Sequence, residues 1–280
     1  MESGFEIVLF LAGLAFGSFL NVCIHRLPRD ASVVRPGSRC PHCGVPVRWY
    51  DNIPLLSWLL LRGRCRDCGA SISFRYFVVE LLTAILFAMC GVWFGVSWLA
   101  IRFCIFCFLV VGLIFMDAET GLLPRAFTYS GIALGIATSG LAPLDSSGSG
   151  VLLRLYGIQL PTAALAVVDS VLGALVGAAF FYLAWALYYL VRHRHGLGFG
   201  DIALIAMCGA FLGLKLTLFV LFSGPVLGVM YAIVWLARSP GRKQNWLASE
   251  VPFGVFLGVS ALLAVFFGEP LCRWYLGRLR

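Results

Sequence analysis

Apolar segments long enough to cross a lipid bilayer recur along this chain and restrict it to a fold of membrane-spanning helices. A helix needs about 20 predominantly apolar residues to cross the hydrocarbon core. Clear segments of this kind lie at about 3–24, 76–95, 98–116, 126–142, 163–191 and 251–268. The stretch 202–237 is too long for one span, and Lys215 or the Gly224-Pro225 pair could mark a turn within it. We therefore expect an all-α polytopic membrane protein with about eight transmembrane helices.

The composition excludes a soluble domain. Hydrophobic residues make up 61% of the 280 residues and charged residues only 12%, whereas soluble domains carry about 25% charged residues. The first apolar segment has no basic residues before it and no small-residue cleavage site after it, so we expect a retained span and not a signal peptide. We expect three parts: a first transmembrane helix at 1–25, a cytoplasmic loop at 26–75, and a membrane-embedded core at 76–280.

The orientation follows from the basic residues. The loop 26–75 carries nine arginines and three aspartates, which places it in the cytoplasm by the positive-inside rule. Two expected spans lie between this loop and Asp117, two more between Asp117 and Asp201, and two more before the basic segment 238–243. All of these features are therefore expected on the cytoplasmic side. The arginines near the C-terminus disagree with this topology, so we expect the tail to lie along the membrane interface.

Two Cys-x2-Cys pairs in the loop form the strongest local motif. Cys40 and Cys43 are separated by 21 residues from Cys65 and Cys68, a spacing typical of a tetrahedral zinc site with four thiolates. A glycine after the second cysteine of each pair permits a tight turn. Two disulfides or unpaired structural thiols are the alternatives, but a reducing cytoplasm disfavours disulfides. We expect a structural Zn²⁺ with no open position for catalysis, which leaves His42 unneeded as a ligand.

The charge of the loop favours lipid headgroups over nucleic acid as its partner. Nine arginines minus three aspartates give +6, and four thiolates with one Zn²⁺ lower this to about +4. Anionic headgroups account for such a loop without a further partner. Neither a GxGxxG segment after a strand nor a GxxxxGK[ST] segment occurs in the sequence, so nucleotide-binding folds lack support.

Asp117 and Asp201 each stand beside a long apolar segment. A carboxylate at the edge of the hydrocarbon layer is costly unless it has a partner or a function. Two carboxyls within hydrogen-bond distance cannot both ionise, so such a pair would share one proton and could hydrolyse an amide through an activated water. Gly198 and Gly200 would let an extended substrate approach Asp201. The alternative is that both aspartates are helix N-caps. We expect the two carboxyls to lie about 4–8 Å apart before substrate binds.

Two further acidic residues have simpler interpretations. Glu80 lies about one turn into its span, where a snorkelling carboxylate that pairs with Arg75 or Arg26 is favoured over a catalytic one. Asp169 lies near the outer end of its span and is expected at the interface.

Taken in order along the chain, seven motifs resemble one known family. They are Asn21-Val-Cys-Ile-His-Arg-Leu-Pro28, the paired cysteines, Trp49-Tyr-Asp-Asn-Ile-Pro54-Leu-Leu-Ser-Trp58, Arg75-Tyr76 with Glu80, Asp117-Ala-Glu119 with Leu123-Pro124, Gly198-Phe-Gly-Asp201, and Pro252-Phe-Gly254. Together they are similar to the type IV prepilin leader peptidases with N-methyltransferase activity, which belong to the GxGD class of membrane aspartic proteases. The resemblance extends over about 17–257.

The resemblance implies a two-function enzyme of the bacterial inner membrane. It would cut the short basic leader from type IV prepilins or type II secretion pseudopilins after a glycine on the cytoplasmic side. It would then methylate the new N-terminal residue with S-adenosylmethionine. By position, Asp117 and Asp201 match the catalytic pair, with Gly198, Gly200 and Glu119 as supporting residues of the active-site motifs.

The residues that bind the methyl donor are not identified by the motifs. Trp49, Tyr50 and Trp58 could stack on an adenine, and arginines of the loop could meet the methionine carboxylate, but ordinary packing explains each of them equally well.

Two positions depart from the family pattern. Arg125 stands where the family commonly has Asp, and Ala203 where it commonly has Lys.

The open alternatives are a peptidase without methylation, a transporter that uses its carboxylates as a proton or cation relay, and a zinc-bearing assembly scaffold.

Overall fold

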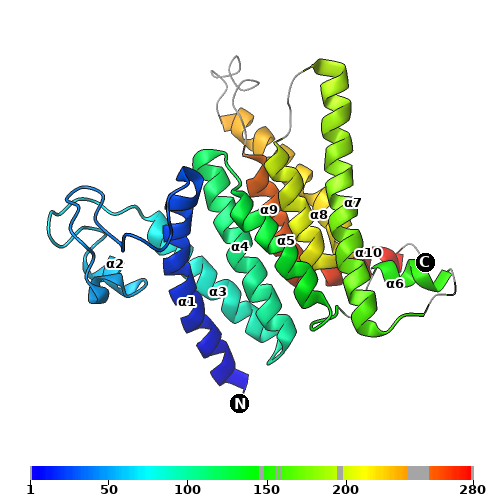
Figure 1. Cartoon of the computed structure of the whole chain (residues 1–280), viewed down its shortest axis with the longest axis horizontal. Helices are drawn as coiled ribbons and strands as arrows, with labels where there is room; N and C mark the ends of the chain where they lie inside the picture. Colours follow the sequence, from blue (N-terminus) through cyan, green and yellow to red (C-terminus); the bar gives the residue numbers. More distant parts are fainter. Residues whose placement is uncertain are drawn as a thin grey trace. The chain divides into compact units, whose positions relative to one another are not determined.

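The computed structural model describes residues 2–144, 148–155, 157, 159–193, 198–238 and 252–278. These residues form helices joined by turns, with no strand beyond two isolated bridges, so the expected all-α fold is confirmed. The helices are α1 (Glu2–Arg26), α2 (Leu56–Leu60), α3 (Arg75–Phe94), α4 (Trp98–Thr120), α5 (Arg125–Ser139), α6 (Gly148–Leu155), α7 (Thr162–Arg192), α8 (Phe199–Arg238), α9 (Phe253–Leu263) and α10 (Glu269–Arg278) (Figure 1). A π-helical turn, Ala264–Gly268, joins α9 to α10. The basic residues at 239–243 lie outside the described residues.

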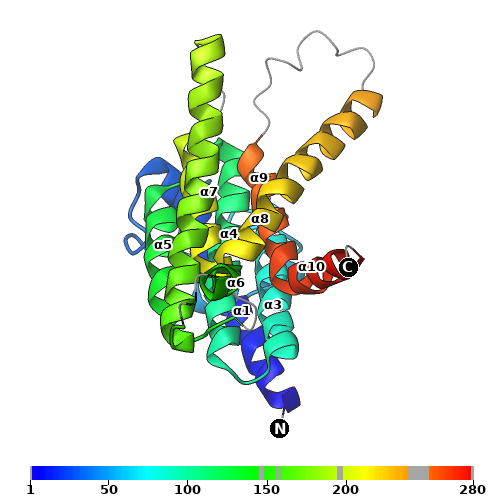
Figure 2. The same cartoon turned by 90° about the vertical axis from the view of Figure 1, so that its right-hand side faces the viewer.

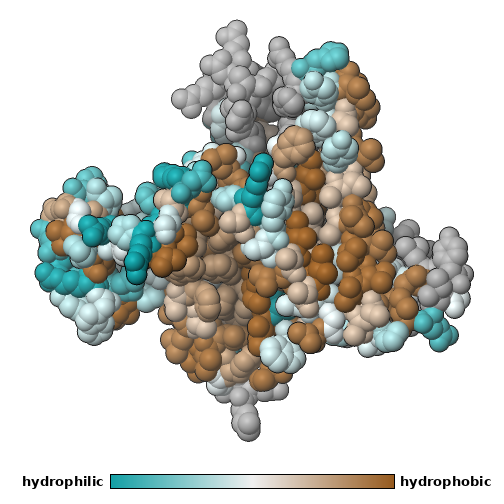
Figure 3. Space-filling model, viewed as in Figure 1, coloured by the Kyte–Doolittle hydropathy of each residue, from teal (hydrophilic) through white to brown (hydrophobic). Residues whose placement is uncertain are grey.

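Six of the described helical segments are long and apolar enough to cross a membrane: α1, α3, α4, α7, α8 and the continuous segment from α9 into α10. The expected count of about eight spans is not confirmed. α5 has only 15 residues, which is shorter than the bilayer core requires. In Figure 3, apolar residues cover the long helices and hydrophilic residues gather over the loop between α1 and α3.

α8 explains the other difference in the count. Its 40 residues form one helix broken at Gly213, where φ is 72° and ψ is 177°. Figures 1 and 2 show that the chain reverses its direction at this break. The sequence therefore predicted correctly that 202–237 divides into two, but the turn falls at Gly213. Pro225, part of the other expected turn, lies inside the second half of the helix.

Asp169 of α7 lies against this break. It is buried, and its Oδ1 accepts a hydrogen bond from the Ser149 amide at 2.7 Å. A Cβ atom on Gly213 would collide with Asp169 Oδ2. The carboxylate thus bonds the first turn of α6 beside the break in α8, and its expected position at the membrane interface stays a prediction.

The structure divides into two compact units, 1–112 and 113–280. In the first, α1 and α3 pack closely through small residues, since a Cβ on Gly13 would lie 2.6 Å from Ala84 Cα. In the second, α7 and α8 meet in the same way, and a Cβ on Gly173 would lie 2.6 Å from the Gly209 carbonyl oxygen. Such contacts between small residues are typical of helices that associate within a membrane.

Within the second unit, the ends of several helices meet at one end of the bundle. Figure 1 shows the C-terminal ends of α4 and α7 and the N-terminal ends of α5, α8 and α9 at this end. Asp117 lies in the last turn of α4 and Asp201 in the first turn of α8. The helix topology therefore brings both aspartates to the same end of this unit.

Candidate active site and metal centre

Asp117 is held by the start of another helix. It is buried near the C-terminal end of α4, where the helix dipole disfavours a negative charge. Its Oδ2 accepts a hydrogen bond from the Val255 amide at 3.0 Å, and the Gly254 amide also donates to this carboxylate. Both amides belong to the first turn of α9, after the N-cap residue Pro252, where N–H groups lack partners within the helix. The N-cap alternative for Asp117 in its own helix is therefore wrong.

Asp201 is held within its own helix. Its Oδ2 accepts a hydrogen bond from the Gly198 amide at 3.3 Å, and its own amide donates to the Gly198 carbonyl at 3.1 Å. This reciprocal pattern resembles a capping box, in which an acidic residue in the first turn reaches back to the N-cap. Asp201 is therefore not the N-cap residue of the alternative, but it bonds the residue before the helix from the first turn, and its side chain remains half-buried.

Leu123 joins the two segments. A Cβ on Gly200 would lie 2.9 Å from Leu123 Cβ, and a Cβ on Gly254 would lie 3.3 Å from Leu123 Cδ1 and 2.8 Å from Asp117 Oδ2. Only glycine allows these approaches. Asp117 and Asp201 lie close enough to interact electrostatically. Gly200 therefore serves close packing against Leu123, whereas a Cβ on Gly198 would meet only Asp201 Oδ2, at 3.5 Å, and the Gly200 amide, at 3.9 Å.

The sequence interpretation did not assign Leu123 or the amides of Gly254 and Val255 to the site. A signal for the amides was present, because proline at the start of an apolar segment is typical of a helix N-terminus. Leu123 stands in the motif Leu123-Pro124, but the motif gives it no role, since that role depends on contacts between distant segments.

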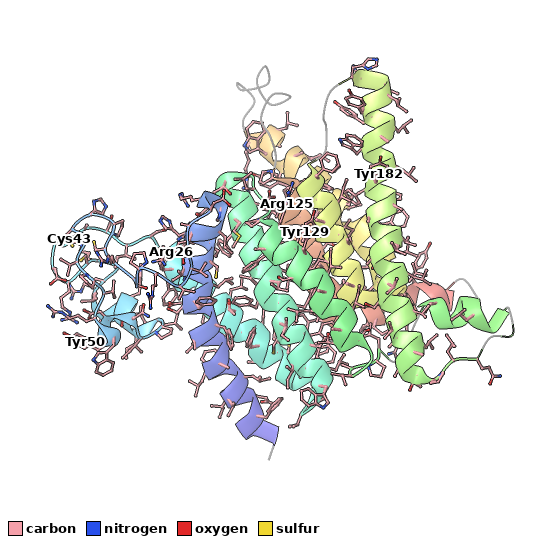
Figure 4. The ribbon with its side chains drawn as sticks, viewed as in Figure 1. Arg26, Cys43, Tyr50, Arg125, Tyr129 and Tyr182 are labelled. Atoms are coloured by element: carbon pink, nitrogen blue, oxygen red, sulfur yellow. The ribbon has the colours of Figure 1, made fainter. Side chains whose placement is uncertain are left out.

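Glu119 and Arg125 lie at the neighbouring helix ends. Glu119 is exposed in the last turn of α4, two residues after Asp117, and side chains two apart do not share a helix face. Arg125 is the exposed first residue of α5, one turn before Tyr129 (Figure 4). A cation at a helix N-terminus is unfavourable, so Arg125 gives up the dipole interaction that an aspartate would make there.

The four cysteines of the loop form a cluster that could hold a metal ion. Their sulfur atoms all lie within 4.8 Å of one another, and the sulfurs of Cys40 and Cys68 are 3.8 Å apart. Four thiolates at about 2.3 Å from a tetrahedral Zn²⁺ would be about 3.8 Å apart. The cysteines are free thiols, so the disulfide alternative does not describe this structure. Their number, type and spacing fit a closed metal site.

The backbone forms the same turn in both halves of the cluster. The amide of each first cysteine donates to the carbonyl five residues further on, at 3.0 Å from Cys40 and 2.8 Å from Cys65. Gly44 and Gly69 have φ values of 69° and 71°, which favour glycine. The predicted glycine turns are confirmed.

The thiols of the cluster differ in pKa, and therefore in how readily they form the thiolate that binds a cation. Hydrogen bonds from the Cys43 and His42 amides lower the pKa of the Cys40 thiol to about 6. A hydrogen bond from the Ala70 amide lowers the pKa of the Cys68 thiol. Burial and the neighbouring sulfurs outweigh this effect and raise the pKa of Cys68 to about 12. A divalent cation would stabilise all four thiolates.

Glu80 anchors the loop to α3. This buried carboxylate accepts a hydrogen bond from the Leu55 amide at 2.8 Å and another from the Ser18 hydroxyl. Leu55 has a φ of 60°, a conformation that a leucine rarely adopts. The expected ion pair of Glu80 with Arg75 or Arg26 is wrong, because in the described structure the carboxylate bonds the loop and α1 instead.

The aromatic residues of the loop have separate surroundings. Trp49 is highly exposed and meets the edge of Tyr50, which also lies near the guanidinium groups of Arg48 and Arg66. Figure 4 labels Tyr50 in the loop. Trp58 packs against Phe74 and Phe77 and donates its indole N–H to the Ile72 carbonyl at 3.4 Å. For Trp58, the packing alternative describes the structure.

Comparison with known proteins assigns both parts of the chain. Residues 11–94 match the model of the bacterial Peptidase A24 N-terminal domain, and residues 103–233 match that of the type IV leader peptidase family. Among curated proteins, a prepilin leader peptidase/N-methyltransferase of Myxococcus xanthus is 41% identical over 86% of this chain and 67% of its own length. Proteins of the same name from Neisseria gonorrhoeae and Aeromonas salmonicida are 34% and 31% identical, and the alignments cover more than nine-tenths of each chain. No solved structure matches the chain. On these matches, the chain belongs to the type IV leader peptidase family.

Proposed function

We propose that this protein is a membrane aspartic endopeptidase that cleaves the short basic leader from type IV prepilins or type II secretion pseudopilins after a glycine. It then methylates the new N-terminal residue, with S-adenosylmethionine as the methyl donor. The observation that carries the proposal is the placement of Asp117 and Asp201 at adjoining helix ends, within electrostatic reach of each other. The relatives named prepilin leader peptidase/N-methyltransferase support both reactions.

The carboxyl pair supplies the chemistry of hydrolysis. One carboxylate takes a proton from water while the protonated partner donates a hydrogen bond to the scissile carbonyl oxygen. The water oxygen bonds to the carbonyl carbon, the C–N bond breaks, and the leaving amine takes a proton from the pair. The Gly254 and Val255 amides hold Asp117 in place, so little reorganisation is needed during the reaction.

The substrate enters at the membrane edge in this proposal. A short basic leader would lie in water, so carboxyls at the membrane edge would meet the scissile bond at the end of that leader. The space beside Gly198 is suited to an extended backbone, because few atoms of the described residues lie near that side of the glycine. Both proposed reactions act on a protein that lies partly in the lipid bilayer, and they require no nucleic acid.

We assign the loop's metal site to a structural Zn²⁺ bound by Cys40, Cys43, Cys65 and Cys68. Thiolates are suited to zinc, and four of them leave no position for water or substrate. We further divide the chain into a first helix at 1–25, the zinc loop at 26–75, and a peptidase core at 76–280. Glu119 is kept as a supporting residue of the peptidase core.

The protein is a multi-pass protein of the bacterial inner membrane, with its zinc loop and its carboxyl pair facing the cytoplasm in our proposal. The excess of arginine in the loop supports this orientation. It also supports methylation by a cytoplasmic cofactor, because the donor and the newly formed N-terminus would be on the same side.

The test is incubation of the purified protein with a prepilin-like protein that carries its leader, followed by mass spectrometry of the product. We expect loss of the leader after glycine, and a gain of one CH₂ on the new N-terminus when S-adenosylmethionine is present. Cleavage without this gain would indicate a peptidase only. An uncleaved substrate would refute the proposal and favour a scaffold or a transporter.

A further inference from the structure

A cavity lies between α1 and the zinc loop, within the unit 1–112. Its volume is about 370 Å³. One wall is a face of α1 that includes Ser18, Phe19 and Arg26, and the other is the loop segment 33–38 together with Asn52 and Pro54. Figure 4 labels Arg26 at the end of α1, beside the loop. We propose that this cavity binds the methyl donor S-adenosylmethionine, an inference that rests on the methylation proposed above.

The size and lining of the cavity fit a small molecule of mixed polarity. Ligand pockets span about 300–1,000 Å³ and combine apolar walls with a few convergent polar groups. Here valine, proline and phenylalanine form the apolar part, and the Ser38 hydroxyl and the Asn52 amide add hydrogen-bonding groups of the kind that a ribose and an adenine require. Phe19 is stacked on Phe108 with ring centroids 6.4 Å apart, which holds its ring in place at the wall.

Arg26 offers the positive end of the cavity. A guanidinium group has five N–H donors, and Arg26 uses them to bond the Ser32 carbonyl at 2.9 Å and the Gly37 carbonyl at 3.3 Å. These two bonds fix the side chain against the loop and leave further donors. The remaining donors can bind a carboxylate, such as that of the methionine part of the donor.

Glu80 lies behind the cavity wall and carries the negative charge nearest to Ser18. Its buried carboxylate bonds the hydroxyl of Ser18, which lines the cavity, and the amide of Leu55, which follows the lining residue Pro54. Charges act strongly through such a buried, low-dielectric setting. Glu80 is a positioning residue behind the wall, and its charge favours a cation in the cavity. S-adenosylmethionine carries a positive sulfonium and a negative carboxylate. Glu80 would favour the sulfonium, and Arg26 would bind the carboxylate.

The experiment measures binding, not turnover. Purified full-length protein is titrated with S-adenosylmethionine by calorimetry in the absence of prepilin. We expect Arg26→Gln to weaken binding at least about tenfold, which is the loss expected when a charge-assisted hydrogen bond is removed. Arg29→Gln is the matched control, because Arg29 lies outside the cavity and donates to the His25 carbonyl.

A second variant fills the cavity without removing a charge. A Cβ on Gly37 would meet no atom within 4 Å, so the first atom of a side chain fits there, and the ring of Gly37→Phe should occupy space in the cavity and weaken binding. Zinc content and thermal unfolding of each variant report whether the loop has kept its fold.

A third variant tests the charge of Glu80. Glu80→Gln should weaken binding of S-adenosylmethionine more than binding of S-adenosylhomocysteine, because the thioether of the product carries no positive charge. A merely structural role would weaken both equally, and that result would overturn the part of the inference that concerns Glu80.

The outcomes separate this inference from the proposed function. If the wild-type protein methylates but folded Arg26→Gln and Gly37→Phe proteins bind the donor normally, the cavity assignment is wrong and the function stands. If the wild-type protein neither binds nor methylates, methylation itself fails. A phospholipid that copurifies in the cavity and is not displaced by the donor would also overturn the assignment.

Discussion

The cysteine cluster and the carboxyl pair are built in opposite ways. All four cysteines lie within residues 40–68, and each half closes through its own backbone hydrogen bonds. The carboxyl pair comes from α4 and α8, and its surroundings add α9 and Leu123. A local site depends on its own turns, whereas the assembled site depends on the packing of helices that are distant in sequence. Substitutions should therefore affect the two sites differently.

Removal of two metal ligands should have the largest effect. Cys65→Ser combined with Cys68→Ser should lower the zinc content from one per chain to none and unfold the loop, because binding and folding of such sites are coupled. Methylation should fall more than cleavage, since the loop forms a wall of the proposed donor cavity, whereas the carboxyl pair comes from α4 and α8. Elemental analysis and mass spectrometry measure the two effects.

Cys272→Ser is the control for this experiment, because Cys272 lies outside the cluster and should leave the zinc content unchanged. Full zinc content in the double variant would move the metal to another site. Equal loss of both activities would mean that the loop only supports the membrane core.

A methyl group added beside the assembled site should have a smaller but clear effect. In Gly254→Ala the new Cβ would lie 2.8 Å from Asp117 Oδ2, so the carboxyl must shift. Displacements of this kind cost about 10- to 100-fold in cleavage rate. Gly228→Ala is the matched control in the same unit, since its Cβ would make an ordinary contact of 3.6 Å with Phe256. Equal rates in the two variants would contradict the assigned geometry.

The smallest effect concerns the break in α8. Asp169→Ala leaves the buried Ser149 amide without its acceptor, so unfolding in detergent should require about 1–3 kcal/mol less free energy. Glu269→Gln weakens partly exposed ion pairs with Lys215 and Arg273 and should cost less than about 1 kcal/mol. Denaturant titration compares them, and wild-type stability of the Asp169→Ala protein would show that Asp169 does not stabilise the break.

The sequence predicted the local site well because its geometry follows from short spacings. The paired cysteines and their glycines determine the turns that bring four sulfurs together. Apolar length predicted most helices, since a bilayer sets that length. The placement of Asp117 and Asp201 at one end follows from helix parity within the second unit.

Features that depend on tertiary contacts were not predictable. The turn in α8 falls at Gly213, where a side chain would collide with Asp169, and the residues next to Gly213 in the sequence do not predict that contact. Glu80 bonds Leu55 and Ser18, not a nearby arginine, because the loop folds back to α3. The N-terminus of α9 reaches Asp117 across the bundle, and spacing along the chain cannot show this.

The central claim is that Asp117 and Asp201 perform the hydrolysis, and the cleavage rates of the single Asp→Asn variants test it most directly. Each change keeps the size of the side chain but removes its proton transfer, so cleavage should fall about 10²- to 10⁴-fold. Both variants should retain zinc and methylate a pre-cleaved substrate. Asp30→Asn, in an exposed position of the loop, should cleave at the wild-type rate. Wild-type cleavage by a folded Asp117→Asn or Asp201→Asn protein would contradict the account.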